Sequence, residues 1–199
     1  MNLRGVTMAF VATVLFAVVV VGSVPAQTND IRKIDFKSYT FESPMCAQAF
    51  KTPSRIRVTE GVFRRNDVSY QVGSYKMEGE TYADLLGDGK EEAIVPMSCE
   101  LQGANDWLNE ILIYGMGTSG PVLLARLDED RLRRDYRRYY PVSDIWSSVW
   151  SLKVQGRTIE LEKNADGPHC CPKWKVRMSY GWNGRTFVIA GKPGRRPAG

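Results

Sequence analysis

The sequence predicts a mainly β fold: an antiparallel, hairpin-rich sheet, arranged as a sandwich or a partly open barrel, with one short helix. Runs rich in aromatic and β-branched residues recur about every 8–12 residues, which is typical of strands joined by hairpins. Gly, Asn and Asp separate these runs, and the pair Asn183-Gly184 is a strong signal for a hairpin turn. One segment alone has apolar residues at helical spacing.

The expected strands follow one another as consecutive hairpins. The connections are clearest at residues 117–120 (GTSG), at Gln155-Gly156 and at Asn183-Gly184. In chain order, the strands are expected within residues 35–42, 55–63, 69–77, 91–98, 107–116, 121–128, 149–154, 157–163, 174–182 and 185–191.

The helix is expected within residues 128–141, DEDRLRRDYRRYYP. Its acids come first and its arginines later, Leu132, Tyr136 and Tyr139 share one face, and Pro141 ends it. Its five arginines could form a patch for anions or nucleic acid. Because four acids nearly balance them, we expect a solvated face with local ion pairs and no nucleic-acid partner.

Residues 1–26 are interpreted as a signal peptide. Arg4 supplies a positive charge, residues 6–21 form an almost unbroken apolar run, and Val24 and Ala26 stand as in a small-residue cleavage site. The apolar run approaches the length of a membrane-spanning helix, so an uncleaved anchor, and with it a membrane contact, stays open. We expect an exported protein, periplasmic or extracellular. Residues 27–191 would form a single β-rich domain, and the basic segment 192–199 a disordered tail.

The four cysteines, in an exported protein, predict two disulfides. Cys170 and Cys171 are adjacent, and in an extended chain their side chains would point to opposite sides. We therefore expect one of them to pair with Cys99 and the other with Cys46, and the sequence leaves open which pairs with which. The same divergence argues against zinc held by these two residues and His169, the single histidine.

The stretch YADLLGDGKEEAIV has two interpretations. Asp84, Asp88 and Glu92 surround two glycines and partly resemble the calcium loops of FG-GAP and integrin-type β-propeller repeats. Leu86, however, stands where such a loop needs an oxygen ligand. The favoured alternative is a tight type I′ hairpin turn at Asp88-Gly89. We therefore expect no cofactor, with calcium as the alternative.

Several motifs resemble a widespread family of small exported bacterial proteins of uncharacterised function. They are DLLGDGKEEAIV, the following Cys99, NEILIYGM and GPHCCPKWKVRMSYGWNGRTF. The family pattern is similar to D-L-T-G-D-G-x-x-E-A-V-V, a later C-P pair and a closing Y-x-W-x-G-x-x-F; Leu86 replaces its usual Thr. The resemblance covers most of residues 34–190. It implies a bacterial, exported, β-rich domain and no established activity.

Three functions remain as hypotheses. The first is a non-enzymatic extracytoplasmic binding or interaction domain, with a glycan or an envelope protein as partner, because tryptophans on one outer sheet face would form a stacking surface. The second is a cell-wall or glycan hydrolase that uses two nearby carboxylates. The third is a structural envelope protein without a small ligand. The tryptophans are Trp107, Trp146, Trp150, Trp174 and Trp182, and the carboxylates Asp84, Asp88, Glu91 and Glu92.

Overall fold

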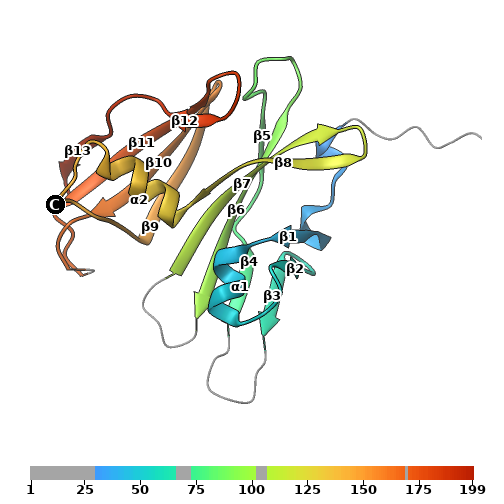
Figure 1. Cartoon of the computed structure of the whole chain (residues 1–199), viewed down its shortest axis with the longest axis horizontal. Helices are drawn as coiled ribbons and strands as arrows, with labels where there is room; N and C mark the ends of the chain where they lie inside the picture. Colours follow the sequence, from blue (N-terminus) through green and yellow to red (C-terminus); the bar gives the residue numbers. More distant parts are fainter. Residues whose placement is uncertain (1–29, 66–72, 102–106, 169) are drawn as a thin grey trace, which may run out of the picture.

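Two antiparallel sheets and a smaller N-terminal layer make up the computed structural model, which describes residues 30–65, 73–101, 107–168 and 170–199 (Figure 1). Within these residues the larger sheet has six strands in the order β3-β4-β6-β7-β8, and β5 pairs with the start of β6. The mainly β, antiparallel fold class is confirmed. The strands are β3 (Val62–Arg65), β4 (Gly73–Met77), β5 (Thr81–Ala83), β6 (Glu92–Leu101), β7 (Trp107–Gly117) and β8 (Gly120–Asp128).

The second sheet comes from the C-terminal part of the chain. Its described strands run in the order β12-β11-β10-β9, and β13 pairs with β11. The expected hairpins β9–β10 and β11–β12 are confirmed. In the second, the Asn183 side-chain oxygen accepts the backbone N–H groups of Arg185 and Thr186 at 3.0 and 2.9 Å, which fixes the turn. The strands are β9 (Ile145–Gln155), β10 (Thr158–Ala165), β11 (Trp174–Trp182), β12 (Phe187–Ile189) and β13 (Gly194–Pro197).

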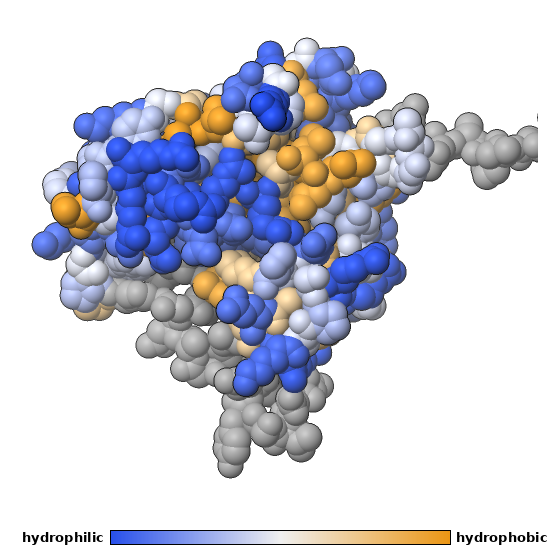
Figure 2. Space-filling view, viewed as in Figure 1, coloured by the Kyte–Doolittle hydropathy of each residue, from blue (hydrophilic) through white to orange (hydrophobic). Residues whose placement is uncertain are grey.

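The expected helix is confirmed as α2 (Glu129–Arg137), which connects β8 to β9. It begins where the Asp128 carboxylate accepts the backbone N–H of Arg131 at 2.9 Å. Leu132 and Tyr136 are buried in the core, whereas most of the arginines lie on the outer side. Figure 2 shows the hydrophilic surface that gathers over α2. The spacing of Leu132 and Tyr136 therefore predicts the packed face correctly, whereas Tyr139 lies beyond the end of α2 and is 38% exposed, so its expected place on that face was wrong.

The N-terminal layer contains a helix that the sequence analysis missed, α1 (Pro44–Phe50). Ser43 caps it by accepting the N–H of Cys46 at 3.3 Å, and Pro44 occupies the first turn, where its missing N–H costs nothing. The Ser-Pro pair was thus a helix start signal. The remaining elements of the layer are η1 (Ile31–Lys33), η2 (Phe36–Ser38) and the paired strands β1 (Thr40–Glu42) and β2 (Arg55–Arg57).

Both faces of the six-stranded sheet are buried, which is why β6 and β7 are apolar at most positions. Along β7, Ile111 and Ile113 belong to the cluster shared with the five-stranded sheet and α2, whereas Leu112 and Tyr114 belong to the cluster under the N-terminal layer. A strand buried on both faces reads as a continuous apolar run instead of an alternating one. The six-stranded sheet is therefore the middle layer of the described fold.

The C-terminal segment differs from the disordered tail expected for residues 192–199. It forms β13, which pairs with Trp174–Arg177 of β11, and Arg196 contacts the Glu162 carboxylate at 2.9 Å. The composition of the tail favoured disorder, but backbone pairing to a free sheet edge overrides it. The signal peptide expected at residues 1–26 lies outside the described residues. Among the described helices, none is long and apolar enough to span a membrane.

Candidate functional site

The acidic loop, residues 84–92, connects β5 to β6 and uses its carboxylates to hold its own backbone. The Asp84 carboxylate accepts the N–H groups of Gly87, Asp88 and Gly89 at 2.5, 3.1 and 3.0 Å. The Asp88 carboxylate accepts the N–H of Lys90 at 3.0 Å. Ala83 pairs with Glu92, so the connection is longer than the expected two-residue type I′ turn, and that detail of the prediction was wrong.

Glu92 holds the other side of the acidic loop from inside the protein. The residue is 2% exposed, and its Oε2 accepts the N–H groups of Leu85 and Leu86 at 2.8 and 3.1 Å. Burial raises the pKa of Glu92, and the two backbone hydrogen bonds oppose that rise in part. The Arg157 guanidinium closes the loop by donating to the carbonyls of Leu85 and Leu86.

The arrangement of the acidic loop serves folding. Asp84 and Glu92 between them accept five backbone N–H groups, which an irregular connection otherwise leaves unsatisfied. Gly87 has φ +75°, and a side chain there would lie 2.2 Å from the Arg157 guanidinium. Within the described residues, no group of three or more acidic, histidine or cysteine side chains is placed to hold a metal ion. The loop therefore resembles a calcium site in sequence and a capped turn in structure.

The predicted cysteine pairing was wrong. Cys46 and Cys99 are joined to each other, with their Cα atoms 5.7 Å apart, and both are fully buried. The reason is the unexpected helix α1, which lays Cys46 over the face of β6 that carries Cys99, next to Val95 and Met97 in the same cluster. The bridge therefore fastens the N-terminal layer to the middle sheet.

Cys170 and Cys171 are exposed and face each other, with their Sγ atoms 2.6 Å apart. The expected divergence assumed an extended chain, but the N–H of Cys171 donates to the carbonyl of Pro168 at 2.9 Å, so the backbone turns there. The hydrogen bond with Cys170 raises the pKa of the Cys171 thiol. These two residues thus form a close, solvent-exposed pair of thiols.

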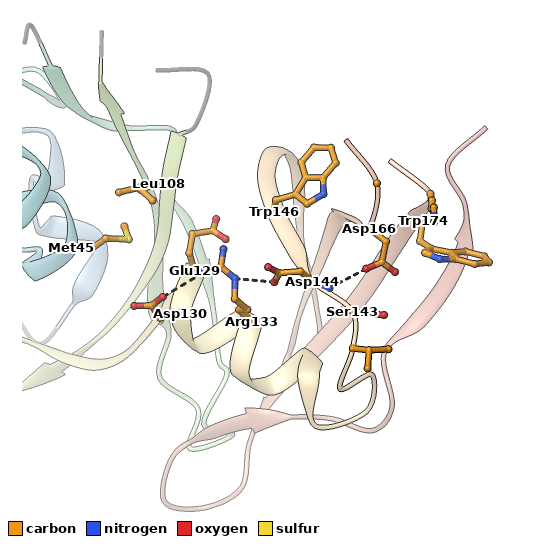
Figure 3. A pocket seen from close by; sticks show the side chains of 13 residues that line it. Met45, Leu108, Glu129, Asp130, Arg133, Ser143, Asp144, Trp146, Asp166 and Trp174 are labelled. Atoms are coloured by element: carbon orange, nitrogen blue, oxygen red, sulfur yellow. Dashed lines mark hydrogen bonds and ion pairs between the residues drawn. The ribbon is translucent and has the colours of Figure 1, made fainter. Parts of the chain in front are cut away.

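A hollow, called here the α2 groove, lies between α2, the start of β9 and the start of β11, and it is also lined by Met45 of α1 and Leu108 of β7. Its volume is about 970 Å³. Figure 3 shows Met45 and Leu108 on one side and Trp146 and Trp174 on the other. The remaining lining residues are Glu129, Asp130, Arg133, Val142, Ser143, Asp144, Asp166, Gly167 and Lys173.

A chain of charged groups runs along the α2 groove. The Arg133 Nε donates to the Asp144 carboxylate at 2.9 Å and lies 3.8 Å from Asp130 through its Nη1. The backbone N–H of Asp144 donates to the Asp166 carboxylate at 3.0 Å. Figure 3 shows this row crossing from α2 to the end of β10. The polar groups hold one another in fixed positions, so a ligand would meet a pre-formed surface.

The start of α2 is fixed by a buried ion pair. Lys163 of β10 lies 2.6 Å from the Glu129 carboxylate, and their side chains are 2% and 5% exposed. Burial lowers the pKa of Lys163, and the nearby Glu129 charge opposes that shift. Separating the two groups would leave each charge buried without a partner, which is strongly destabilising. The pair therefore keeps its geometry. The wall of the groove is accordingly rigid where Glu129 lines it.

Two of the described tryptophans line the α2 groove, and Trp174 also packs against the same core cluster as Trp182. Trp146 and Trp174 are half-buried and line the groove, whereas Trp182 packs against Phe187 at 5.3 Å between ring centroids. Arg195 of β13 supports this side: its guanidinium lies 3.5 Å from the Tyr140 ring centroid and 5.9 Å from that of Trp174. The side chains of Trp107 and Trp150 lie outside the described residues.

Sequence reasoning identified Trp146 and Trp174 as candidates but missed the charged partners beside them. Arg133, Asp144 and Asp166 come from separate segments, and the only signal was the acid–arginine pattern of the helix. Comparison of the chain with models of protein families, with curated proteins and with solved structures finds no significant match. The chemistry of the site therefore rests on its own geometry: rings, fixed charges and a volume suited to a small ligand.

Proposed function

We propose that this protein is an exported, non-enzymatic binding domain and that it binds a glycan of the cell envelope in the α2 groove. The observation that carries the proposal is the placement of Trp146 and Trp174 beside the fixed row Arg133, Asp144 and Asp166. A sugar ring has an apolar face that packs on an aromatic ring and hydroxyl groups that hydrogen-bond to charged side chains. The groove offers both kinds of contact.

The size of the α2 groove supports a small ligand. Its volume of about 970 Å³ falls at the upper end of the range for small-molecule sites, which are concave and contain a few placed polar groups. The mutual ion pairs of Arg133, Arg137 and Asp144 limit side-chain rearrangement on binding. A pre-formed surface lowers the entropy cost of association.

Export is part of the same proposal. A buried disulfide such as Cys46–Cys99 is typical of proteins that fold outside the reducing cytosol. The charged and apolar pattern of residues 1–26 is typical of a secretion signal, and the resemblance to small exported bacterial proteins agrees with it. The partner is therefore sought among molecules of the bacterial envelope.

Binding is favoured over hydrolysis because the carboxylates are already engaged. Glycoside hydrolysis needs two carboxyl groups flanking the scissile bond, one kept protonated by its surroundings. Asp84 and Glu92 face their own backbone, and Asp144 is paired with Arg133 and Arg137 at 2.9 and 3.1 Å. These partners hold the carboxylates in structural roles. The groove itself favours a binding protein over a structural envelope protein without a ligand.

The test is a calorimetric titration of the exported chain with soluble peptidoglycan fragments. Trp174→Ala should weaken binding at least about tenfold, because a tenfold change corresponds to about 1.4 kcal/mol and a lost aromatic contact is of that order. Arg185→Ala, on the exposed β11–β12 turn, is the matched control and should bind as the parent does. Equal binding by Trp174→Ala and the parent would refute the groove as the site, and absence of any binding would refute the glycan.

A further inference from the structure

The two exposed thiols of Cys170 and Cys171 are chemically distinct from the buried bridge elsewhere in the fold. Their Sγ atoms lie 2.6 Å apart on the connection between β10 and β11, and both residues are open to solvent. Cys46 and Cys99 are fully buried, so a dissolved thiol or disulfide cannot reach them in the folded chain. Only the first pair has the access that thiol–disulfide exchange requires.

We propose that Cys170 and Cys171 form a reversible thiol–disulfide exchange site, whose substrates are small or peptide disulfides and whose oxidised form is a disulfide between the two neighbours. One thiol loses its proton, and its sulfur attacks the substrate disulfide, so that a mixed disulfide forms and one thiol of the substrate leaves. The second sulfur then attacks the mixed disulfide and releases the other thiol. Two protein thiols and one disulfide become one protein disulfide and two thiols.

The geometry supports both steps of this exchange. The hydrogen bond with Cys170 raises the pKa of the Cys171 thiol, so Cys171 keeps its proton longer and is the second of the two sulfurs to attack. The close approach of the two sulfurs lets the mixed disulfide be resolved within the chain instead of by a second molecule. A disulfide between neighbours closes a small, constrained ring, and a constrained exposed disulfide is more easily reduced than an ordinary one. The site is therefore reversible, whereas Cys46–Cys99 is permanent.

The position of the pair connects its oxidation state to the rim of the α2 groove. The Cys171 carbonyl packs on Gly167, so closely that a Cβ atom at residue 167 would lie 2.7 Å from the carbonyl oxygen. The backbone N–H of Lys173 donates to the Asp166 carbonyl at 2.8 Å. Asp166, Gly167 and Lys173 all line the groove. Ring closure constrains the peptide between Cys170 and Cys171, so the Cys171 carbonyl and the rim residues packed on it must adjust. This consequence is independent of what the groove binds.

The chemical step is tested by equilibrating the full chain with glutathione buffers of rising oxidised-to-reduced ratio, followed by alkylation and peptide mass spectrometry. The peptide with both cysteines should pass from a doubly alkylated form to an unalkylated form that is two hydrogen atoms lighter than the free dithiol peptide. At the ratios that reduce this pair, Cys46 and Cys99 should stay joined to each other, because reduced glutathione does not reach them in the folded chain. Cys170→Ser and Cys171→Ser should each end as a single glutathione adduct. Two adducts on the parent chain, or two free thiols at every ratio, would overturn the proposal.

The structural step is tested by backbone amide hydrogen exchange on the oxidised and reduced chain. Exchange should differ in residues 166–174 and stay unchanged in the acidic loop. The double variant Cys170→Ser/Cys171→Ser, treated with the same buffers, should show no difference at all. Identical exchange in the oxidised and reduced parent would overturn the link between the dithiol and the groove rim, and a difference that persists in the double variant would do the same.

Discussion

The acidic loop and the α2 groove contain the same kinds of side chain, yet they use them in opposite ways. In the loop, Asp84 and Glu92 are separated by eight positions in the sequence and accept hydrogen bonds from the backbone between them. In the groove, Arg133, Asp144 and Asp166 come from three segments and contact each other around an open volume of about 970 Å³. Carboxylates that are close in the sequence hold the turn of the acidic loop, whereas charged residues that are far apart in the sequence form the surface of the α2 groove.

The difference teaches that a compact acidic motif is not by itself a site. An irregular loop between two strands has unsatisfied N–H groups, and a nearby carboxylate is an effective acceptor for them. A ligand surface instead needs groups that face outward from a rigid support. Lys163, Glu129 and Arg195 provide that support here, since they tie the groove wall to β10 and β13.

The largest expected loss of stability comes from removing the Lys163–Glu129 ion pair that supports the α2 groove. Lys163→Met leaves the Glu129 carboxylate buried without its partner, so the free energy of unfolding should fall by about 3–5 kcal/mol. Chemical denaturation measures it. The double variant Lys163→Met/Glu129→Met should regain most of that loss, because no uncompensated charge remains. A double variant as unstable as the single one would show that the pair is not what holds α2.

The next largest loss of stability comes from removing the carboxylate that caps the acidic loop. Asp84→Ala leaves three backbone N–H groups without their acceptor and should lower the free energy of unfolding by about 2 kcal/mol. Asp88→Ala is the matched control, since within the described residues that exposed side chain accepts one backbone N–H, that of Lys90, and it should cost about 0.5 kcal/mol. Thermal denaturation compares the two. Equal losses would contradict the assignment of Asp84 as the cap of the loop.

The comparison also shows what the sequence could and could not predict. The hairpins and α2 follow from local patterns, Asn183-Gly184 and the spacing of Leu132 and Tyr136, because turns and helix faces are decided by neighbours in the chain. The pairing of Cys46 with Cys99 depends on how α1 packs over β6, and the order at β13 depends on a free sheet edge.

The groove was beyond prediction for the same physical reason. Arg133, Asp144 and Lys173 have no mutual spacing that would mark them, and only the packing of α2 on the five-stranded sheet brings them together. The acidic loop shows the converse: its pattern suggested a ligand, whereas Asp84, Asp88 and Glu92 accept hydrogen bonds from the backbone of the loop itself.

A smaller effect is the pH dependence of the stability that Glu92 contributes. Burial raises its pKa above the ordinary value of 4.5, so the folded chain keeps the proton longer than the unfolded chain does. The stability from this residue is therefore fully present below pH 4.5 and is lost as the pH rises through the raised pKa. Glu92→Gln keeps an oxygen acceptor and does not ionise. The stability of the parent minus that of Glu92→Gln should fall between pH 4.5 and neutral pH; a rise would contradict the burial argument.

The smallest effect concerns calcium. Because Asp84, Asp88 and Glu92 accept backbone N–H groups and Leu86 offers no side-chain oxygen, millimolar calcium should shift the melting temperature by less than about 2 °C. Magnesium at the same concentration is the control for ionic strength. A saturable, calcium-specific shift that disappears in Asp88→Ala would restore the loop as a metal site.

The most direct test of the whole account is an amide chemical-shift titration of the isotope-labelled chain with a soluble peptidoglycan fragment. If the groove binds the ligand and the acidic loop only supports the fold, the shifts should change at residues 129–133, 143–146 and 166–174 and stay constant at residues 84–92. Changes centred on residues 84–92, with the groove unaffected, would contradict the account.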